Sequence, residues 1–306
     1  MTFIKKLLTT TLVLLFTACG TSPTSDNTLD IAMLPVLDAF PVVLAYHRGY
    51  FAEAGVDVVL HQFTAAVERD TAFQVSAHID AIVTDVVGQA IFYQGGIATV
   101  ATSASIGLAS VVGSVGVTEL EQVAGLPAMI SINTSMDYIL HSALASVGLA
   151  QAHVAVTSVP GIPVRLELLL NNTDHIATLP EPFASMAIEQ GLTYLTSTTS
   201  LDINPFVYLF RTQVVTERRD QVLAFYEAVG RAVQLINYGD REAFIDLIIQ
   251  VVGYPPEVRD TLILPTFPMP APPELRHVED VLGFVRERGL LSVELTAEQA
   301  ISELLR

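Results

Sequence analysis

This 306-residue chain has two lysines, one cysteine and no tryptophan. Both lysines, Lys5 and Lys6, lie at the beginning of the chain, so arginine and histidine supply every later basic side chain. The formal charge is −17, and it falls to −19 without the two lysines. Nucleic-acid-binding proteins carry a basic patch or stripe, which this composition excludes. A strongly acidic chain also gains nothing from long-range attraction to anionic solutes or lipids.

Cys19 is the single cysteine, which excludes an intrachain disulfide and a metal site built from several cysteines. The seven histidines are scattered without a familiar metal-ligand spacing. The G-x-S-x-G, H-E-x-x-H and G-x-x-x-x-G-K-[ST] motifs of hydrolases, zinc proteases and nucleotide-binding proteins are absent. We therefore expect a protein that binds a molecule without catalysing a reaction, and we expect neither a metal nor a cofactor.

Long apolar runs are missing after the first twenty residues, and the run at the start has the features of a signal peptide. Lys5 and Lys6 precede a short apolar segment at residues 7–16, which is too short for a transmembrane helix. We predict a signal peptide at residues 1–18 and a small, polar tether at residues 19–28.

Ala18-Cys19-Gly20 resembles a bacterial lipobox, in which the cysteine thiol is acylated and the cysteine becomes the new N-terminus. Phe16 stands where the lipobox usually has leucine. We predict a lipid anchor on Cys19 that holds the protein to a membrane of the cell envelope, facing the periplasm or the exterior. Ordinary cleavage that leaves an unmodified cysteine is the alternative.

Short apolar segments alternate with helical patterns in both halves of the chain, as in proteins with parallel sheets. The first such unit has a strand at residues 29–34, a loop, a helix at residues 41–53 and a second strand at residues 56–60. Gly55 is a typical residue for the end of that helix. The pattern predicts an α/β protein with a duplicated architecture.

We assign residues 29–116 and 211–306 to lobe I, and residues 117–210 to lobe II. The chain is mainly helical after residue 216, and we expect these helices to return to lobe I. The expected helices lie at residues 221–238, 241–252, 256–262, 274–288 and 296–306.

The segment LAYHRGYFAEAGVDV at residues 44–58 resembles the signature lA-x-x-x-GyF-x-x-x-Gl-x-V of one group of periplasmic substrate-binding proteins. That group contains binders of thiamine-pyrimidine precursors, sulfonates, taurine and nitrate. The resemblance continues at residues 78–81, 117–125, 138–149 and 180–183. The chain departs from the family at Ser76-Ala77-His78, which lacks the usual glycine, and at residues 171–175.

The resemblance implies a type II periplasmic-binding-protein fold, in which each lobe is a mainly parallel sheet flanked by helices and the ligand cleft lies between the lobes. It also implies a monomer that captures a small molecule by lobe closure and serves the permease and ATPase subunits of an ABC importer. A ligand-sensing lipoprotein is one alternative. A thiamine-pyrimidine synthase of the same fold is another, but such enzymes are intracellular and carry a cysteine- and histidine-rich iron site.

Ligand contacts in such a fold come from loops after strands and from helix N-termini. In lobe I these positions hold Asp38, Phe40, Phe63, Thr64, Thr84 and Asp85. In lobe II they hold Asn133, Ser135, Asp137, Tyr138, Gly161, Ile162, Glu181 and Phe183. Each acid can also be interpreted as a helix cap or a solvated charge, and each aromatic side chain as core packing.

Asp38, Asp85, Asp137 and Glu181 supply four acids to these loops, whereas Arg165 is the one arginine close to them. Four carboxylates would oppose an anion by about 1 kcal/mol each at short range. We therefore expect a ligand with N–H or amino donors, and within the family this favours a thiamine-pyrimidine precursor or a related nitrogen heterocycle. The alternatives are a sulfonate, taurine or nitrate, a riboflavin-type ligand, and a polyamine-like amine.

Overall fold

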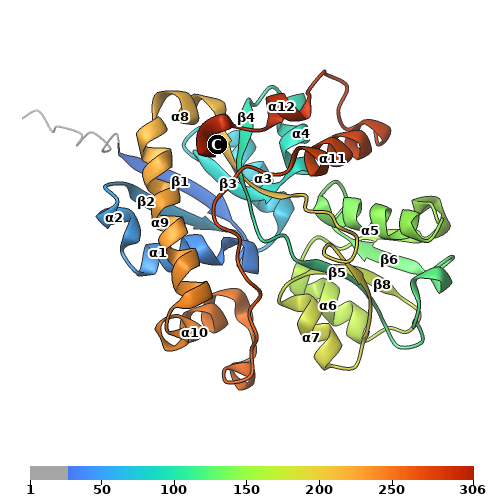
Figure 1. The fold of residues 1–306 in the computed structure, drawn as a ribbon. Helices are drawn as coiled ribbons and strands as arrows, with labels where there is room; N and C mark the ends of the chain where they lie inside the picture. Colours follow the sequence, from blue (N-terminus) through green and yellow to red (C-terminus); the bar gives the residue numbers. More distant parts are fainter. Residues whose placement is uncertain (1–26) are drawn as a thin grey trace, which may run out of the picture.

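The computed structural model describes residues 27–306 (Figure 1). The predicted signal peptide, the lipid anchor on Cys19 and most of the tether fall within residues 1–26, outside the described residues. The described chain forms two lobes, each built on a five-stranded sheet. The predicted α/β architecture with two lobes is confirmed.

The sheet of lobe I has the order β2 (Asp57–Gln62), β1 (Thr28–Met33), β3 (Ala81–Asp85), β10 (Phe206–Arg211) and β4 (Thr99–Ala104). β1 is parallel to β2 and β3, whereas β10 is antiparallel to β3 and β4. The helices of this lobe are α1 (Phe40–His47), α2 (Tyr50–Glu53), α3 (Ala66–Val75), α4 (Val86–Gln94), α8 (Thr212–Glu217), α9 (Arg219–Tyr238), α10 (Ile245–Ile248), α11 (Leu275–Glu287) and α12 (Ala297–Ala300).

The sheet of lobe II repeats this topology in the order β7 (Ala155–Ser158), β6 (Pro127–Ile130), β8 (Ile176–Pro180), β5 (Ala109–Gly113) and β9 (Thr193–Ser197). β6 is parallel to β7 and β8, and β5 is antiparallel to β8 and β9. Its helices are α5 (Ser135–Ser146), α6 (Ile162–Leu170) and α7 (Phe183–Glu189).

The chain passes into lobe II before β5 and returns to lobe I before β10, because β5 pairs within the sheet of lobe II and β10 within the sheet of lobe I. The predicted boundaries at residues 116/117 and 210/211 divide the chain differently, with β5 in lobe I and most of β10 in lobe II. Both strands are buried and apolar, and that pattern is the same whichever sheet a strand joins. The chain crosses between the sheets at residues 105–108 and 198–205.

The helix expected at residues 41–53 is two helices in the structure. Gly49 has a φ of +71°, and this left-handed residue separates α1 from α2. The prediction of one helix at residues 296–306 is wrong beyond α12, which ends at Ala300. Ile301 instead forms a β-bridge with Ala101 of the edge strand β4, which covers that edge.

Residues 241–262 form short helical turns in place of the two predicted helices. Gly253, with a φ of +88°, and the pair Pro255-Pro256 interrupt any longer helix there. The turns are η4 (Arg241–Ala243), α10, the π-helical η5 (Ile249–Gly253) and η6 (Pro256–Val258).

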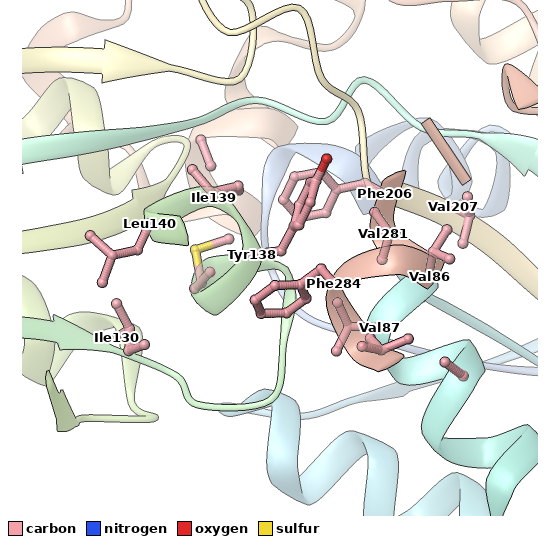
Figure 2. Packing of buried hydrophobic residues seen from close by; sticks show 14 of the residues in the cluster. Val86, Val87, Ile130, Tyr138, Ile139, Leu140, Phe206, Val207, Val281 and Phe284 are labelled. Atoms are coloured by element: carbon pink, nitrogen blue, oxygen red, sulfur yellow. The ribbon is translucent and has the colours of Figure 1, made fainter. Parts of the chain in front are cut away.

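One apolar core continues from lobe I into lobe II. In Figure 2, Tyr138 of α5 lies next to Phe284 of α11, and Val281 of α11 and Val86 of α4 lie close by. The rings of Tyr138 and Phe284 are 5.5 Å apart between centroids. The two lobes are therefore in direct contact, and the cleft between them is narrow.

Candidate functional site

A cavity of about 50 Å³ lies between the lobes, which is room for about three to five water molecules. Its apolar wall includes Val36, Val83, Met136, Ile162 and Phe206. The polar side chains that line the cavity are Asp38, Arg69, Thr84 and Asp85 from lobe I, and Ser131, Thr134, Ser135 and Arg165 from lobe II.

The cavity brings together five of the residues that the sequence singled out. Asp38 lines it from the segment after β1, and Thr84 and Asp85 line it from the end of β3. Ser135 and Ile162 line it as the first residues of α5 and α6. These are the carboxyl ends of strands and the N-termini of helices, where the fold places ligand contacts.

The four aromatic candidates belong to apolar packing and do not line the cavity. Phe40 is fully buried in the core of lobe I and packs against Phe244. Tyr138 packs against Phe284 at the interface between the lobes. Phe63 and Phe183 are partly buried against neighbouring apolar clusters.

The other five candidates are polar or small, and they also lie outside the cavity lining. Thr64 donates to Glu68 at 2.8 Å, and Gly161 precedes α6 as its N-cap residue. The structure places the other three, Asn133, Asp137 and Glu181, at helix N-termini. Asn133 donates its backbone N–H to Asp137 at 3.1 Å. Glu181 accepts from the backbone N–H of Ser185 at 3.2 Å, and burial raises the pKa of Glu181.

Asp38 is buried, and it connects the loop after β1 to the first crossover. Its Oδ1 accepts from the Ser105 hydroxyl at 2.5 Å and from the Gly107 N–H at 2.9 Å. The Tyr208 hydroxyl donates to the backbone carbonyl of Asp38 at 2.8 Å. Burial raises the pKa of Asp38, and the hydrogen bonds from Ser105 and Gly107 offset part of this rise. Asp38 therefore has a structural role as well as a place on the cavity wall.

Arg69 is a cavity residue that the sequence-based prediction missed. It is buried, donates to the Val83 carbonyl at 2.8 Å and to the Thr84 hydroxyl at 2.7 Å, and forms an ion pair with Asp70. Its position four residues before the buried Phe73 was the available signal, because side chains four apart share one helix face.

Arg165 is fully buried and donates only to backbone carbonyls. The distances are 2.9 Å to Val159, 2.5 Å to Thr178 and 3.3 Å to Pro160. In the described part of the chain, no carboxylate lies within ion-pair distance of it. Burial lowers the pKa of Arg165 to about 10. Its place four residues before the buried Leu169 indicates an inward-facing position, as for Arg69.

Asp85 contacts both lobes. Its Oδ1 accepts from the Gly88 N–H at 2.8 Å, which caps α4 in lobe I. Its Oδ2 accepts from the Ser135 N–H at 3.0 Å, at the start of α5 in lobe II. The cavity wall from lobe I thus presents the acids Asp38 and Asp85 beside Arg69, which is paired with Asp70. The wall from lobe II presents Arg165, which has no ion-pair partner among the described residues.

No helix between residues 27 and 306 is long and apolar enough to cross a membrane. Over the same residues, no group of three or more histidine, cysteine, aspartate or glutamate side chains is arranged to hold a metal ion.

Residues 22–253 match the model of the NMT1-like family. No curated protein matches the chain in sequence.

Solved structures with this fold include periplasmic binding proteins and the desulfurization enzyme DSZB. The alkanesulfonate-binding protein SsuA from Xanthomonas axonopodis pv. citri, bound to MOPS, has a TM-score of 0.78 and 15% identity over 90% of this chain and 98% of that chain. The aliphatic sulphonate binding protein SsuA from Escherichia coli has a TM-score of 0.76 and 16% identity over 92% and 99%. The nitrate-binding protein NrtA from Synechocystis PCC 6803 has a TM-score of 0.72 and 13% identity over 92% and 92%. The predicted resemblance and the predicted periplasmic-binding-protein fold are confirmed.

Proposed function

Because this chain belongs to the NMT1-like family, we propose that it is the substrate-binding component of an ABC importer and captures a small molecule between its two lobes. The shared fold with SsuA and NrtA supports this function, as does a cavity lined by charged groups from both lobes. The protein acts as a monomer, anchored to a membrane through Cys19, and delivers its ligand to permease and ATPase subunits.

The proposed ligand combines N–H donors with an acidic group. The expectation of a heterocycle without an acidic group depended on four carboxylates at the cleft, but Asp137 and Glu181 do not line the cavity. Asp38 and Asp85 do line it, and they accept hydrogen bonds from N–H donors of an amine or a nitrogen heterocycle.

The observation that carries this proposal is the environment of Arg165. Its guanidinium is buried at the cavity without an ion-pair partner among residues 27–306. An unpaired buried charge is costly, and removing its solvent is not offset by carbonyl groups alone. A carboxylate or sulfonate of the ligand supplies the missing partner through charge-assisted hydrogen bonds.

A matched panel of compounds tests the ligand class by thermal shift. Taurine carries both groups, ethanesulfonate carries only the acid, and ethylamine carries only the donor. A heterocyclic set is 4-aminopyrimidine-5-carboxylate, benzoate and 4-aminopyrimidine. We expect the compounds with both groups to raise the melting temperature most. Equal stabilisation by the compounds with only an acid would indicate a simple sulfonate or nitrate binder. Equal stabilisation by the compounds with only N–H donors would favour the earlier hypothesis, a nitrogen heterocycle without an acidic group.

Two substitutions connect the panel to the cavity. Arg165→Lys keeps the positive charge but loses the planar guanidinium, which binds an acid with two hydrogen bonds. The affinity for the dipolar compounds, which carry both an acidic group and an N–H donor, should therefore fall about tenfold or more. Asp38→Ala should weaken the same compounds without unfolding the domain. Arg231→Lys is the control, because Arg231 pairs with Glu53 on the surface. Unchanged affinity in the cavity variants would remove those residues from the binding site.

Transport and anchoring have separate tests. A strain that lacks this protein should lose uptake of the radiolabelled ligand identified by mass spectrometry of the purified protein. Normal uptake with a lost transcriptional response would favour the ligand-sensing alternative, and turnover of the ligand by the purified protein would favour an enzyme. Cys19→Ser should move the protein from the membrane fraction to the soluble fraction, and an unmodified Cys19 in the mature protein would exclude the anchor.

A further inference from the structure

Asp85 fills the N-terminus of a helix that belongs to the other lobe. Ser135 is the first residue of α5, a helix of 12 residues, and its backbone N–H donates to Oδ2 of Asp85 at 3.0 Å. The Asp85 side chain is buried and lines the cavity. The same carboxylate caps α4 through the Gly88 N–H. One acid therefore joins the starts of two helices across the cleft.

The remaining first-turn donors of α5 are bonded within lobe II. The Met136 N–H donates to the Thr134 hydroxyl at 3.2 Å, and the Asp137 N–H donates to the Thr134 carbonyl at 3.0 Å. N–H groups at the start of a helix favour anions because they carry the positive end of the helix dipole. At the cavity, the Asp85 carboxylate thus lies where the oxygen of an anionic ligand would accept a hydrogen bond.

We infer that Asp85 is a specificity-determining residue, which occupies the N-terminus of α5 as an internal anion and excludes an anionic ligand group from that position. This inference depends on the proposed function, because it concerns the same cavity. The acidic group of the ligand is then directed to Arg165, on the wall that lobe II contributes. A small oxyanion without N–H donors meets the negative charge of Asp85 and gains nothing from it.

The hydrogen bond between Ser135 and Asp85 also means that Asp85 excludes an anion only in the closed state. The Ser135 N–H reaches Asp85 only while the lobes are together, because the two residues belong to different lobes. In an open cleft, the N-terminus of α5 is free to attract an anion. On closure, Asp85 competes with that anion for the same donor, so an anion there opposes closure, whereas a ligand that leaves the position vacant permits it.

Asp85→Ser tests this inference with methanesulfonate as the probe. Serine retains a cap for α4, because serine is a favoured N-cap residue, and it removes the charge. We expect the variant to bind methanesulfonate about tenfold or more tightly than the natural protein, since like charges in close contact strongly oppose binding. Isothermal titration calorimetry gives both dissociation constants. Asp85→Asn is a second variant of similar shape, and it should show a gain in the same direction.

Asp80→Asn is the matched control for Asp85→Asn, because Asp80 is a buried acid of lobe I that pairs with Arg218 and does not line the cavity. It should not gain methanesulfonate binding. The inference is overturned if neither Asp85 variant gains affinity, if the Asp80 variant gains as much, or if the natural protein already binds methanesulfonate as tightly. Failure of the proposed function gives a different result, because the natural protein would then bind none of the dipolar compounds.

Discussion

Arg288 donates to Oδ1 of Asp137 at 2.8 Å and so connects the end of α11 in lobe I to the first turn of α5 in lobe II. The Asp137 carboxylate is buried and also accepts from the Gln151 amide at 2.8 Å. Arg288 itself is partly exposed, with 37% of its side chain accessible. This ion pair lies outside the cavity lining, and it holds the lobes together next to the apolar contact between Tyr138 and Phe284.

Arg288→Met should weaken closure without altering the cavity. Methionine keeps apolar contact with Phe284 and removes the donor to Asp137. This loss should cost about 1.5 kcal/mol, the lower end for hydrogen bonds to charged groups, because Arg288 is partly exposed. The dissociation rate of the ligand should rise severalfold in stopped-flow measurements. Arg231→Met, which removes an exposed pair within lobe I, should change it little. Equal rates in the two variants would show that the ion pair does not hold the closed state.

Asp38→Asn should make stability less dependent on pH. Burial raises the pKa of Asp38 in the folded protein above its ordinary value of 3.8. As the pH rises from about 4, the unfolded chain loses this proton first, so the folded state binds more protons and its stability falls until the pH passes the raised pKa. Asparagine has no such proton.

Melting temperatures from pH 4 to pH 8 test this expectation. The melting temperature of the Asp38→Asn variant relative to the natural protein should increase with pH and then level off. The difference isolates Asp38 from Asp70, Asp80 and Glu181, whose pKa values are also raised by burial. A difference that stays constant over the whole range would contradict the raised pKa.

Gly107→Ala should destabilise the crossover far more than Gly49→Ala destabilises the turn between α1 and α2. Both glycines have left-handed backbones, with φ of +63° and +71°, which costs other residues about 1–2 kcal/mol. An added Cβ at Gly107 would lie 2.1 Å from Oδ1 of Asn204, whereas no atom lies within 4 Å at Gly49.

The crowding at Gly107 also breaks hydrogen bonds that join the crossovers. Asn204 donates to the Ser105 carbonyl at 2.9 Å and accepts from the Phe206 N–H at 3.1 Å, and it must move to admit the methyl group. The total loss should be about 3 kcal/mol, from strain together with one or two lost bonds. Chemical denaturation measures both variants, and similar losses would show that Asn204 adjusts freely.

Thr178→Val should leave stability unchanged or raise it by about 1 kcal/mol, because the Thr178 hydroxyl is buried and has no hydrogen-bond partner among the described residues. Thr198→Val is the matched control. The Thr198 hydroxyl is equally buried but donates to the Gly107 carbonyl at 2.7 Å, so its loss should destabilise the protein by about 1–2 kcal/mol. The unfolding free energies of the two variants should therefore change in different directions, and a loss for Thr178→Val would indicate a partner such as bound water.

The strand–loop–helix units could be predicted from the sequence because several combine an apolar strand with a helix ended by glycine, as at Gly55, Gly95 and Gly148. Loops after strands also pointed to Asp38 and Asp85 at the cavity. Local patterns do not encode which sheet a buried strand joins, so β5 and β10 required the three-dimensional pairing. The short segment at Ile301 is helical by pattern, but pairing with Ala101 outweighs that preference.

The two cavity arginines show why the site was harder to predict than the fold. Arg69 and Arg165 lie within the first turns of helices, after the loops in which ligand contacts were sought. Their burial depends on how those helices pack on the sheets. Conversely, Asp137 in the first turn of α5 and Glu181 just before α7 are close to the predicted positions, but their carboxylates bind groups outside the cavity lining. Asp137 accepts from the Asn133 N–H and from Arg288, and Glu181 accepts from the Ser185 N–H. Loop position therefore indicates proximity to the cleft and does not determine which way a side chain points.

The late position of β10 in the chain has a consequence for biosynthesis. The sheet of lobe I lacks the strand between β3 and β4 until β10 has been made, and β10 follows all of lobe II in the sequence. At about 5–20 residues per second, this delay is on the order of ten seconds. The order of the strands thus prevents lobe I from completing its sheet until lobe II has been synthesised.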